Sequence, residues 1–368
     1  MTSLNSLKRR AFLASLAALS FGFAACQSTP PQAPSATGGG SAPAAGGAGG
    51  SGKTAVLSGA GASFPAPLYQ RWFAEYNKVE PGVQISYQSV GSGAGVEQFL
   101  AGTVDFGATD SPLKDEEKAK FKEKYGADPI QVPMTAGSVV FAYNLPEVKD
   151  LKLSRAAYCG IVTGKVTTWN APEIAAANPG VTLPSTNISF VHRSDGSGTT
   201  SVFTTHLDEA CADWTAGANK SVEWPVGTGA KGNEGVTAQV QQAPGAVGYV
   251  EYAYAKENGL SMASIENKSG NIITPSPEAG GLAFKGATIP ADFALTVPDP
   301  ADANAYPITS LTWLLLYPKY DDATKGEALK AVVDWALTDG KQFADQLGYV
   351  SMPPETNGKV KEAVTKIQ

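Results

Sequence analysis

The sequence is poor in the side chains that most often bind metals or act as acid–base catalysts. Its 368 residues include three cysteines and two histidines, and charged residues make up 17% of the chain. The cysteines have no spacing typical of a metal site, and we expect His192 and His206 to be packing residues. The sequence therefore predicts no metal ion and no cofactor.

An apolar run of transmembrane length is also missing from the N-terminal segment. Basic residues 8–10 precede an apolar stretch, 11–25, that is too short to span a bilayer stably, so residues 1–26 are predicted to be a signal peptide. Its ending resembles the lipobox of bacterial lipoproteins, which would place a lipid on Cys26. Ordinary cleavage is the alternative, because Phe23 stands where the lipobox prefers a smaller residue. The basic residues fit either the general or the twin-arginine export route.

Positive charge is scarce once the signal peptide is removed. Residues 1–25 carry three positive charges and no acid, so cleavage changes the formal net charge from −6 to −9. An acidic protein is a poor partner for nucleic acid or for an anionic membrane surface. If the ligand is an anion, local geometry must bind it.

The rest of the chain divides into a linker and a folded part. Residues 27–53 are almost wholly Gly, Ala, Pro, Ser and Thr, which predicts a flexible tether. From residue 54 onward, short apolar runs alternate with segments of helical period, which is typical of an α/β fold. After a strand that ends at Asp110, Ser111 and Pro112 are expected to begin a charged helix that reaches Tyr125.

Three strand-to-helix junctions are rich in glycine and hydroxyl residues: Ser63-Phe64, Ser92, and Ser197-Gly198-Thr199. A helix N-terminus presents unpaired N–H groups and the positive end of the helix dipole. Converging junctions of this kind would suit a tetrahedral oxyanion. Each one alone could equally be an ordinary helix cap.

Two charged residues accompany these junctions. Arg193 lies four residues before Ser197 and would offer a bidentate, permanently charged donor. Asp110 would repel a fully deprotonated anion but could accept a hydrogen bond from one that keeps a proton, as hydrogen phosphate does and sulfate does not. The alternative role for Asp110 is a favourable charge at a helix start.

Four separated segments carry a specific resemblance. They are GAGASFPAP (59–67), YQSVGSGAGV (87–96), VDFGATDSPL (104–113) and RSDGSGT (193–199). In order and spacing they are similar to the signature segments of the phosphate-binding receptors of bacterial phosphate ABC transporters. Three further stretches, at 164–170, 245–252 and 306–310, extend the similarity to the C-terminal part of the chain.

The resemblance implies a fold and a set of roles. The fold would be the two-lobe, type II periplasmic-binding-protein fold, with crossover hinge strands and the ligand in the cleft. Lobe I would comprise residues 54–133 and about 255–368, and lobe II about 134–254. The phosphate-binding residues would be Ser63, Phe64, Ser92, Asp110, Arg193, Ser197, Gly198 and Thr199, with Asp195 holding Arg193 from behind.

The implied function is capture of inorganic phosphate by an exported, lipid-anchored, monomeric protein that meets ABC permease subunits. Alternatives are a receptor for another tetrahedral oxyanion, a phosphate sensor, or a phosphomonoester hydrolase. Hydrolysis is disfavoured because neither Ser92 nor Ser197 lies in a G-x-S-x-G elbow, so we expect no enzyme activity.

Cys159 and Cys211 remain once Cys26 is assigned to the signal segment. Export makes a disulfide between them permissible. Two buried free thiols are the alternative.

Overall fold

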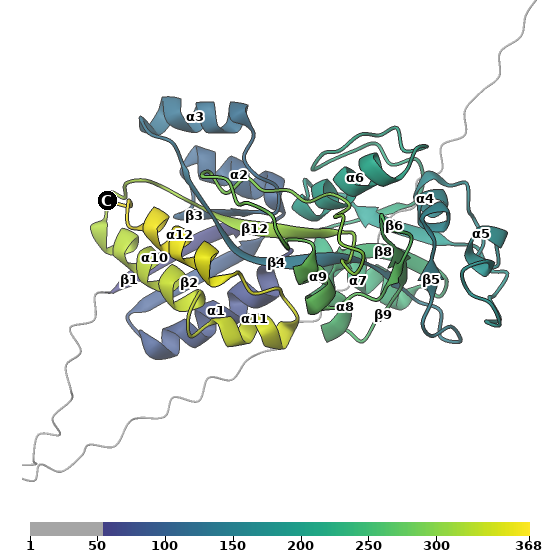
Figure 1. Cartoon of the computed structure of the whole chain (residues 1–368). Helices are drawn as coiled ribbons and strands as arrows, with labels where there is room; N and C mark the ends of the chain where they lie inside the picture. Colours follow the sequence, from purple (N-terminus) through teal and green to yellow (C-terminus); the bar gives the residue numbers. More distant parts are fainter. Residues whose placement is uncertain (1–53) are drawn as a thin grey trace, which may run out of the picture. The chain divides into compact units, whose positions relative to one another are not determined.

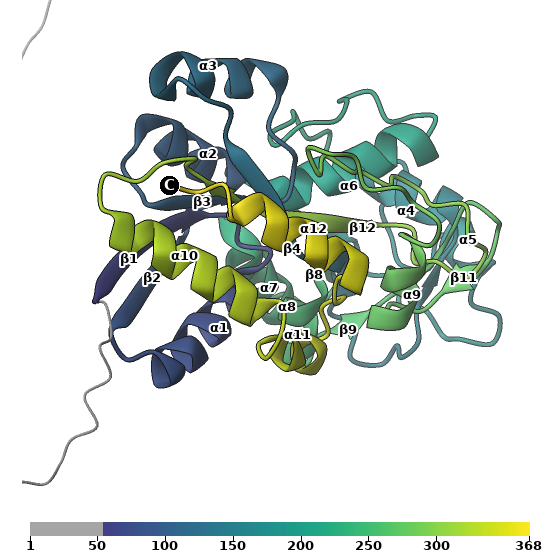
Figure 2. The same ribbon diagram turned by 60° about the vertical axis from the view of Figure 1, so that its left-hand side comes forward.

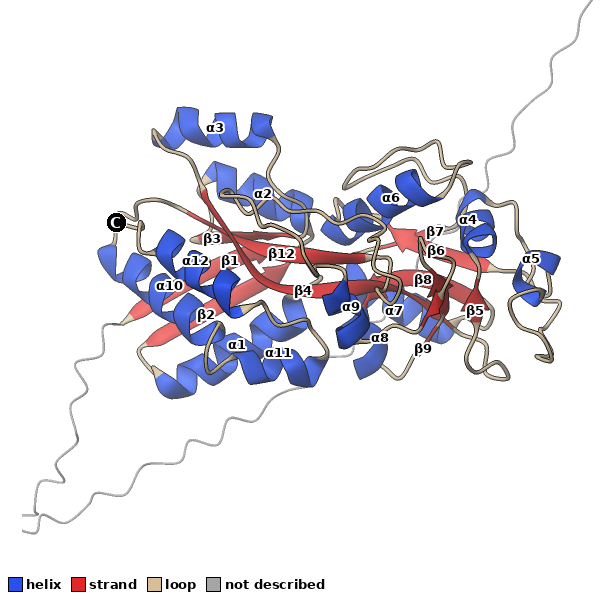
Figure 3. Cartoon of the chain, in the orientation of Figure 1, coloured by secondary structure: helices blue, strands red, loops and turns tan. Residues whose placement is uncertain are grey.

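The computed structural model describes residues 54–368, so the predicted signal peptide, Cys26 and the linker lie outside the described residues. Within that range the predicted α/β class is confirmed, since helices cover a central sheet (Figure 3). In residues 54–368, no helix combines the length and the apolar character needed to cross a bilayer.

The sheet has nine strands, in the order β2-β1-β3-β12-β4-β8-β6-β7, with β9 added beside β4. The strands are β1 (Ala55–Gly61), β2 (Val83–Ser89), β3 (Phe106–Thr109), β4 (Ile130–Tyr143), β6 (Ser189–Arg193), β7 (Thr228–Ala230), β8 (Ala246–Glu251), β9 (Ser261–Met262) and β12 (Thr309–Leu316). β1 runs parallel to β2 and β3, and β6 runs parallel to β7 and β8. The central strands β4 and β12 are antiparallel to each other and to their outer neighbours.

The long strand β4 lies in the middle of the sheet and links its two parts (Figure 1). Its residues 130–138 pair with β12, and its residues 139–143 pair with β8. We call β1, β2 and β3 with helices α1 (Ala66–Val79), α2 (Ser92–Ala101) and α3 (Asp115–Tyr125) the first half. We call β6, β7 and β8 with α6 (Gly198–Ala210) and α7 (Gly232–Gln242) the second half.

The lobe boundary expected near residue 255 stays a prediction, and the strand pairing supports a later position. β9 pairs with the end of β4 that lies in the second half, and β10 (Ser264–Glu266) pairs with β5 (Lys152–Leu153). The chain next pairs with the first half at β12, which lies beside β3. We therefore propose that the chain returns to the first lobe near residue 308.

The charged helix after Asp110 begins later than the sequence predicted. α3 begins at Asp115, not at Ser111 or Pro112. Leu113 is buried and its N–H donates to the Gln131 side chain, which keeps this segment extended. The carboxylate of Glu117 then accepts from the Lys114 N–H and so caps the helix at its actual start.

The first half packs its helices on the sheet through aromatic side chains. Leu68, Trp72 and Tyr76 recur at helical spacing on α1 and are buried, as their period predicts. The Trp72 indole donates to the carbonyl of Gly340, just before α11 (Lys341–Leu347). α10 (Ala323–Ala336) and α12 (Pro354–Val364) pack against each other in front of the sheet (Figure 2).

A disulfide joins α4 (Arg155–Thr163) to the second half. Cys159, in α4, is bonded to Cys211 at the end of α6, with Cα atoms 5.5 Å apart. The remaining elements are short: α5 (Pro172–Ala175), α8 (Tyr252–Glu257), α9 (Pro277–Leu282) and β11 (Ile272–Ile273).

Candidate functional site

The eight predicted ligand residues lie where strands of both halves end, and all eight are buried. Ser63 and Phe64 follow β1, Ser92 follows β2, Asp110 follows β3, and the remaining four lie at the end of β6 and the start of α6. We call this set the cage; it comprises Ser63, Phe64, Ser92, Asp110, Arg193, Ser197, Gly198 and Thr199. Ligands of open α/β sheets bind at this carboxyl edge of the strands.

The first turn of α6 forms the second-half wall of the cage. Ser197 caps the helix, because its Oγ accepts from the Thr200 N–H at 2.9 Å. The N–H groups of Gly198 and Thr199 lie in the helix's first turn, where no carbonyl of the same helix can reach them. Gly198 is so close to the first half that a Cβ there would come within 2.3 Å of Ser92 Oγ and 2.5 Å of Asp110 Oδ2.

Asp110 is the acid of the cage, and hydrogen bonds hold it on two sides. Thr312 Oγ1 donates to Oδ1 at 2.8 Å, and the Asp110 N–H donates to Ser92 Oγ at 3.2 Å. Burial raises the pKa of Asp110 to about 7, although the Thr312 hydrogen bond and the charge of Arg193 act in the opposite direction. A hydrogen bond donated by a protonated ligand would therefore stabilise the charged carboxylate.

Arg193 is the buried cation of the cage. Its Nε and Nη2 donate to the two carboxylate oxygens of Asp195 at 2.7 and 2.5 Å, and Nη1 donates to Thr199 Oγ1 at 3.3 Å. Burial acts to raise the pKa of Asp195, but the hydrogen bonds and charge of Arg193 outweigh it, so the pKa is lowered. Asp195 thus pairs with the guanidinium, which is the contact that the resemblance implies.

The two halves touch at the mouth of the cage. The Gly93 N–H donates to the Gly196 carbonyl at 2.8 Å. Gly91, with φ of 90°, lies where a Cβ would come within 2.3 Å of the Asp195 carboxylate. Glycines are needed here because the backbones approach closely and one is left-handed. The structure is therefore a closed arrangement of the cage.

Asn233, at the start of α7, is a cage neighbour that the sequence analysis missed. Its side chain donates to Ser63 Oγ at 2.8 Å and to Thr199 Oγ1 at 3.0 Å, and so joins the two halves. Thr312, 202 residues from its partner Asp110, was missed as well. A signal existed for Asn233: residues 228–233 are a fourth strand-to-helix junction, with asparagine in place of the serine that marks the other three.

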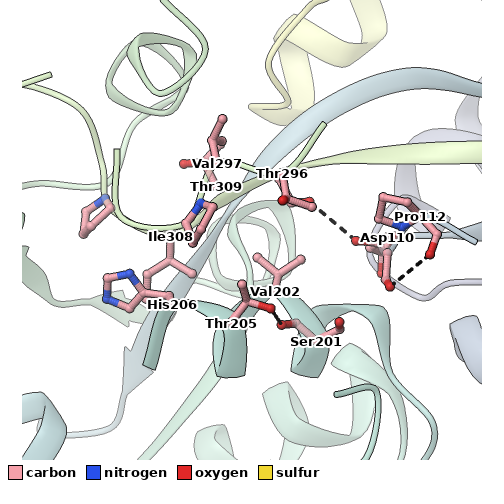
Figure 4. A pocket seen from close by; sticks show the side chains of 14 residues that line it. Asp110, Pro112, Ser201, Val202, Thr205, His206, Thr296, Val297, Ile308 and Thr309 are labelled. Atoms are coloured by element: carbon pink, nitrogen blue, oxygen red, sulfur yellow. Dashed lines mark hydrogen bonds between the residues drawn. The ribbon is translucent and has the colours of Figure 1, made fainter. Parts of the chain in front are cut away.

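A separate small pocket borders the cage (Figure 4). Its cavity, of about 40 Å³, extends from Asp110 past α6 to His206 and is closed by residues 296–298 and 307–310. Its lining contains no lysine or arginine, and burial lowers the pKa of His206 to about 4. The pocket has room for a few water molecules and lacks the charge to hold an anion.

No cluster of metal-ligating side chains occurs in the part of the chain that the structure describes, residues 54–368. The donor set of the cage is instead hydroxyl, amide and guanidinium. Such donors are suited to an anion with several acceptor oxygens.

Known proteins are similar to this chain both in sequence and in architecture. Residues 32–340 match the model of the PBP superfamily domain. The phosphate-binding protein PstS of Pasteurella multocida is 42% identical over 83% of this chain and 88% of its own length. A phosphate-binding protein structure from Stenotrophomonas maltophilia aligns with a TM-score of 0.68 at 20% identity, over 84% of this chain and 94% of that one.

A candidate phosphate ABC transporter substrate-binding protein of Clostridium perfringens, solved with phosphate bound, aligns with a TM-score of 0.60 at 18% identity. The alignment covers 81% of this chain and all of that one. These structural likenesses support the predicted fold, and the sequence identity to PstS extends over most of both chains. The chain belongs to the PstS family of phosphate-binding proteins, within the PBP superfamily.

Proposed function

We propose that this protein captures inorganic phosphate in the cage. One observation carries the proposal. In a single buried site, one guanidinium, several hydroxyls and the N-terminus of α6 lie together with one carboxylate. The donors match the oxygens of a tetrahedral oxyanion, and the helix dipole adds to their attraction. The Arg193 charge offsets part of the ligand's charge.

Asp110 makes phosphate the favoured oxyanion. Sulfate would place two negative groups in contact without a proton between them, in a site where neither can be hydrated. Phosphate keeps a proton at neutral pH and can donate a hydrogen bond through it to the Asp110 carboxylate. We infer that Asp110 makes the site selective for oxyanions that keep a proton.

We propose binding without catalysis. His192 stacks on Trp224 with ring centroids 5.0 Å apart, and His206 hydrogen-bonds the Tyr158 hydroxyl at 3.1 Å. Neither histidine has a hydrogen bond to a cage serine among the described residues. A serine nucleophile would need a base within such reach.

The proposed role is delivery of phosphate to the transmembrane subunits of an ABC importer, with no nucleic acid involved. We propose that the protein is exported and acts as a monomer in the cell envelope, held to the membrane by lipid on Cys26. The role rests on the family relationship and the export signal.

Isothermal titration of the mature, phosphate-stripped protein tests the proposal. Phosphate is expected to bind with a clear heat at micromolar protein, while sulfate and nucleotides give none. The absence of heat with phosphate would contradict the proposed function. Sulfate binding as tight as phosphate binding would contradict only the role given to Asp110.

A further inference from the structure

Asn233 receives no role in the proposed function, yet it is completely buried beside the cage. Its amide oxygen accepts from the Glu251 N–H at 2.9 Å. That contact fixes the orientation of the amide, because the oxygen must face the backbone donor. The NH₂ group then faces Ser63 and Thr199 and supplies one N–H to each hydroxyl.

Both hydroxyl oxygens use their two acceptor positions within the protein. Ser63 Oγ accepts from the backbone N–H of Asn233 at 3.1 Å and from its side chain at 2.8 Å. Thr199 Oγ1 accepts from the Asn233 side chain at 3.0 Å and from Arg193 Nη1 at 3.3 Å. A hydroxyl has two lone pairs and one hydrogen, so only the hydrogen of each remains for another partner.

In residues 54–368 no protein acceptor receives a hydrogen bond from either hydroxyl. Two buried O–H donors are therefore left for the ligand. An oxyanion, whose oxygens accept, satisfies them, whereas a ligand that needs to donate at these positions finds no acceptor.

We propose that Asn233 is a positioning residue that sets the hydrogen-bond polarity of the cage: it occupies the acceptor sites of Ser63 and Thr199, so that both hydroxyls can only donate to the bound oxyanion. The proposal rests on the proposed phosphate function. Ser63 lies in the first half and Thr199 in the second. The same amide can therefore orient both hydroxyls only when the two halves are closed.

A double-mutant cycle with phosphate as the probe tests this role. In the wild-type background, Asn233→Ala should weaken phosphate binding by about 10- to 100-fold, because two donors lose their fixed direction. In a Ser63→Ala/Thr199→Val background, the same change should weaken binding further by less than about threefold, since no hydroxyl remains to be oriented. A purely structural role would give the same loss in both backgrounds and would overturn the proposal.

A matched control is Asn178→Ala. Asn178 is a buried asparagine whose side chain bonds the backbone of Lys152 and Ile174. This variant should lower the unfolding temperature while phosphate affinity stays within about twofold of the wild type. A loss of affinity as large as that of Asn233→Ala would show that any lost buried amide has this effect, and would contradict the proposal.

Asn233→Asp keeps the shape of the side chain and provides a second test of the proposal if the alanine variant does not fold. The carboxylate would accept from both hydroxyls and turn their hydrogens away from the ligand, so binding should fall at least about 100-fold. Affinity within tenfold of the wild type would overturn the inference. Failure of the wild type itself to bind phosphate would contradict the proposed function instead.

Discussion

The two halves of the cage contribute opposite charges. The first half supplies hydroxyls and one acid, Asp110, whose pKa is raised mainly by burial. The second half supplies Arg193, already paired with Asp195, and the N-terminus of α6. We propose a division of labour that rests on the proposed function: the second half attracts small anions, and the first half determines which anion binds.

Removal of the second half's cation should have the largest effect. Arg193→Ala takes away the only charged donor of the cage and leaves Asp195 without its charged partner, with the Gly232 N–H as its remaining donor. Phosphate affinity should fall by about 1000-fold, or roughly 4 kcal/mol, in isothermal titration.

The control for that variant is Arg155→Ala, which breaks another bidentate pair, with Asp299, away from the cage. Its phosphate affinity should match that of the wild type. If Arg193→Ala bound phosphate as tightly as Arg155→Ala, the second half would not be the source of attraction.

The first half should make the ligand-free protein less stable as pH rises. Asp110 has a folded pKa of about 7 against an ordinary value of 3.8, so between these values the folded state binds more protons than the unfolded state. The free energy of unfolding of the wild type, relative to Asp110→Asn, should therefore decrease by about 2–4 kcal/mol from pH 4 to pH 7.

Urea unfolding of both phosphate-stripped proteins across this pH range measures the difference. Asp195 should not contribute to it, because its lowered pKa makes its stabilisation complete above pH 4 and lost only in stronger acid. Parallel stability curves for the two proteins would contradict the charge assignment for Asp110.

A smaller effect is expected on selectivity. Asp110→Asn should weaken phosphate binding by about tenfold and strengthen sulfate binding by a similar factor, because the amide accepts a hydrogen bond less strongly and does not repel a proton-free oxyanion. Competition titrations measure both changes. Asp105→Asn, which affects the partly exposed pair with Lys325, should leave the ratio unchanged. An unchanged ratio in Asp110→Asn would show that the first half does not select the anion.

The residues proposed for the cage could be identified in the sequence because each junction is a local pattern. Ser92 and Ser197 each stand at the start of a helix that follows a strand, so both are recognisable from the neighbouring residues. Asp110 was proposed for the same reason, because it stands at the end of its strand. Their convergence required the resemblance to a known family, since no local pattern specifies it.

The residues that were missed act across long sequence separations. Asn233 is 170 residues from Ser63, and only the folding of both halves brings them together. The start of α3 was misplaced because a tertiary contact of Leu113 with Gln131 overrides the local capping signal of Ser111. The lobe boundary depends on strand pairing, which the alternation of helices and strands does not specify.

Gly198 has a consequence for how the protein can be altered. Its Cα faces Ser92 and Asp110 so closely that even one methyl group would collide with both. An alanine at this position would sterically prevent the two halves from closing, although it removes none of the polar side chains of the cage. The absence of a side chain at residue 198 is thus what allows the ligand groups of the two halves to come together.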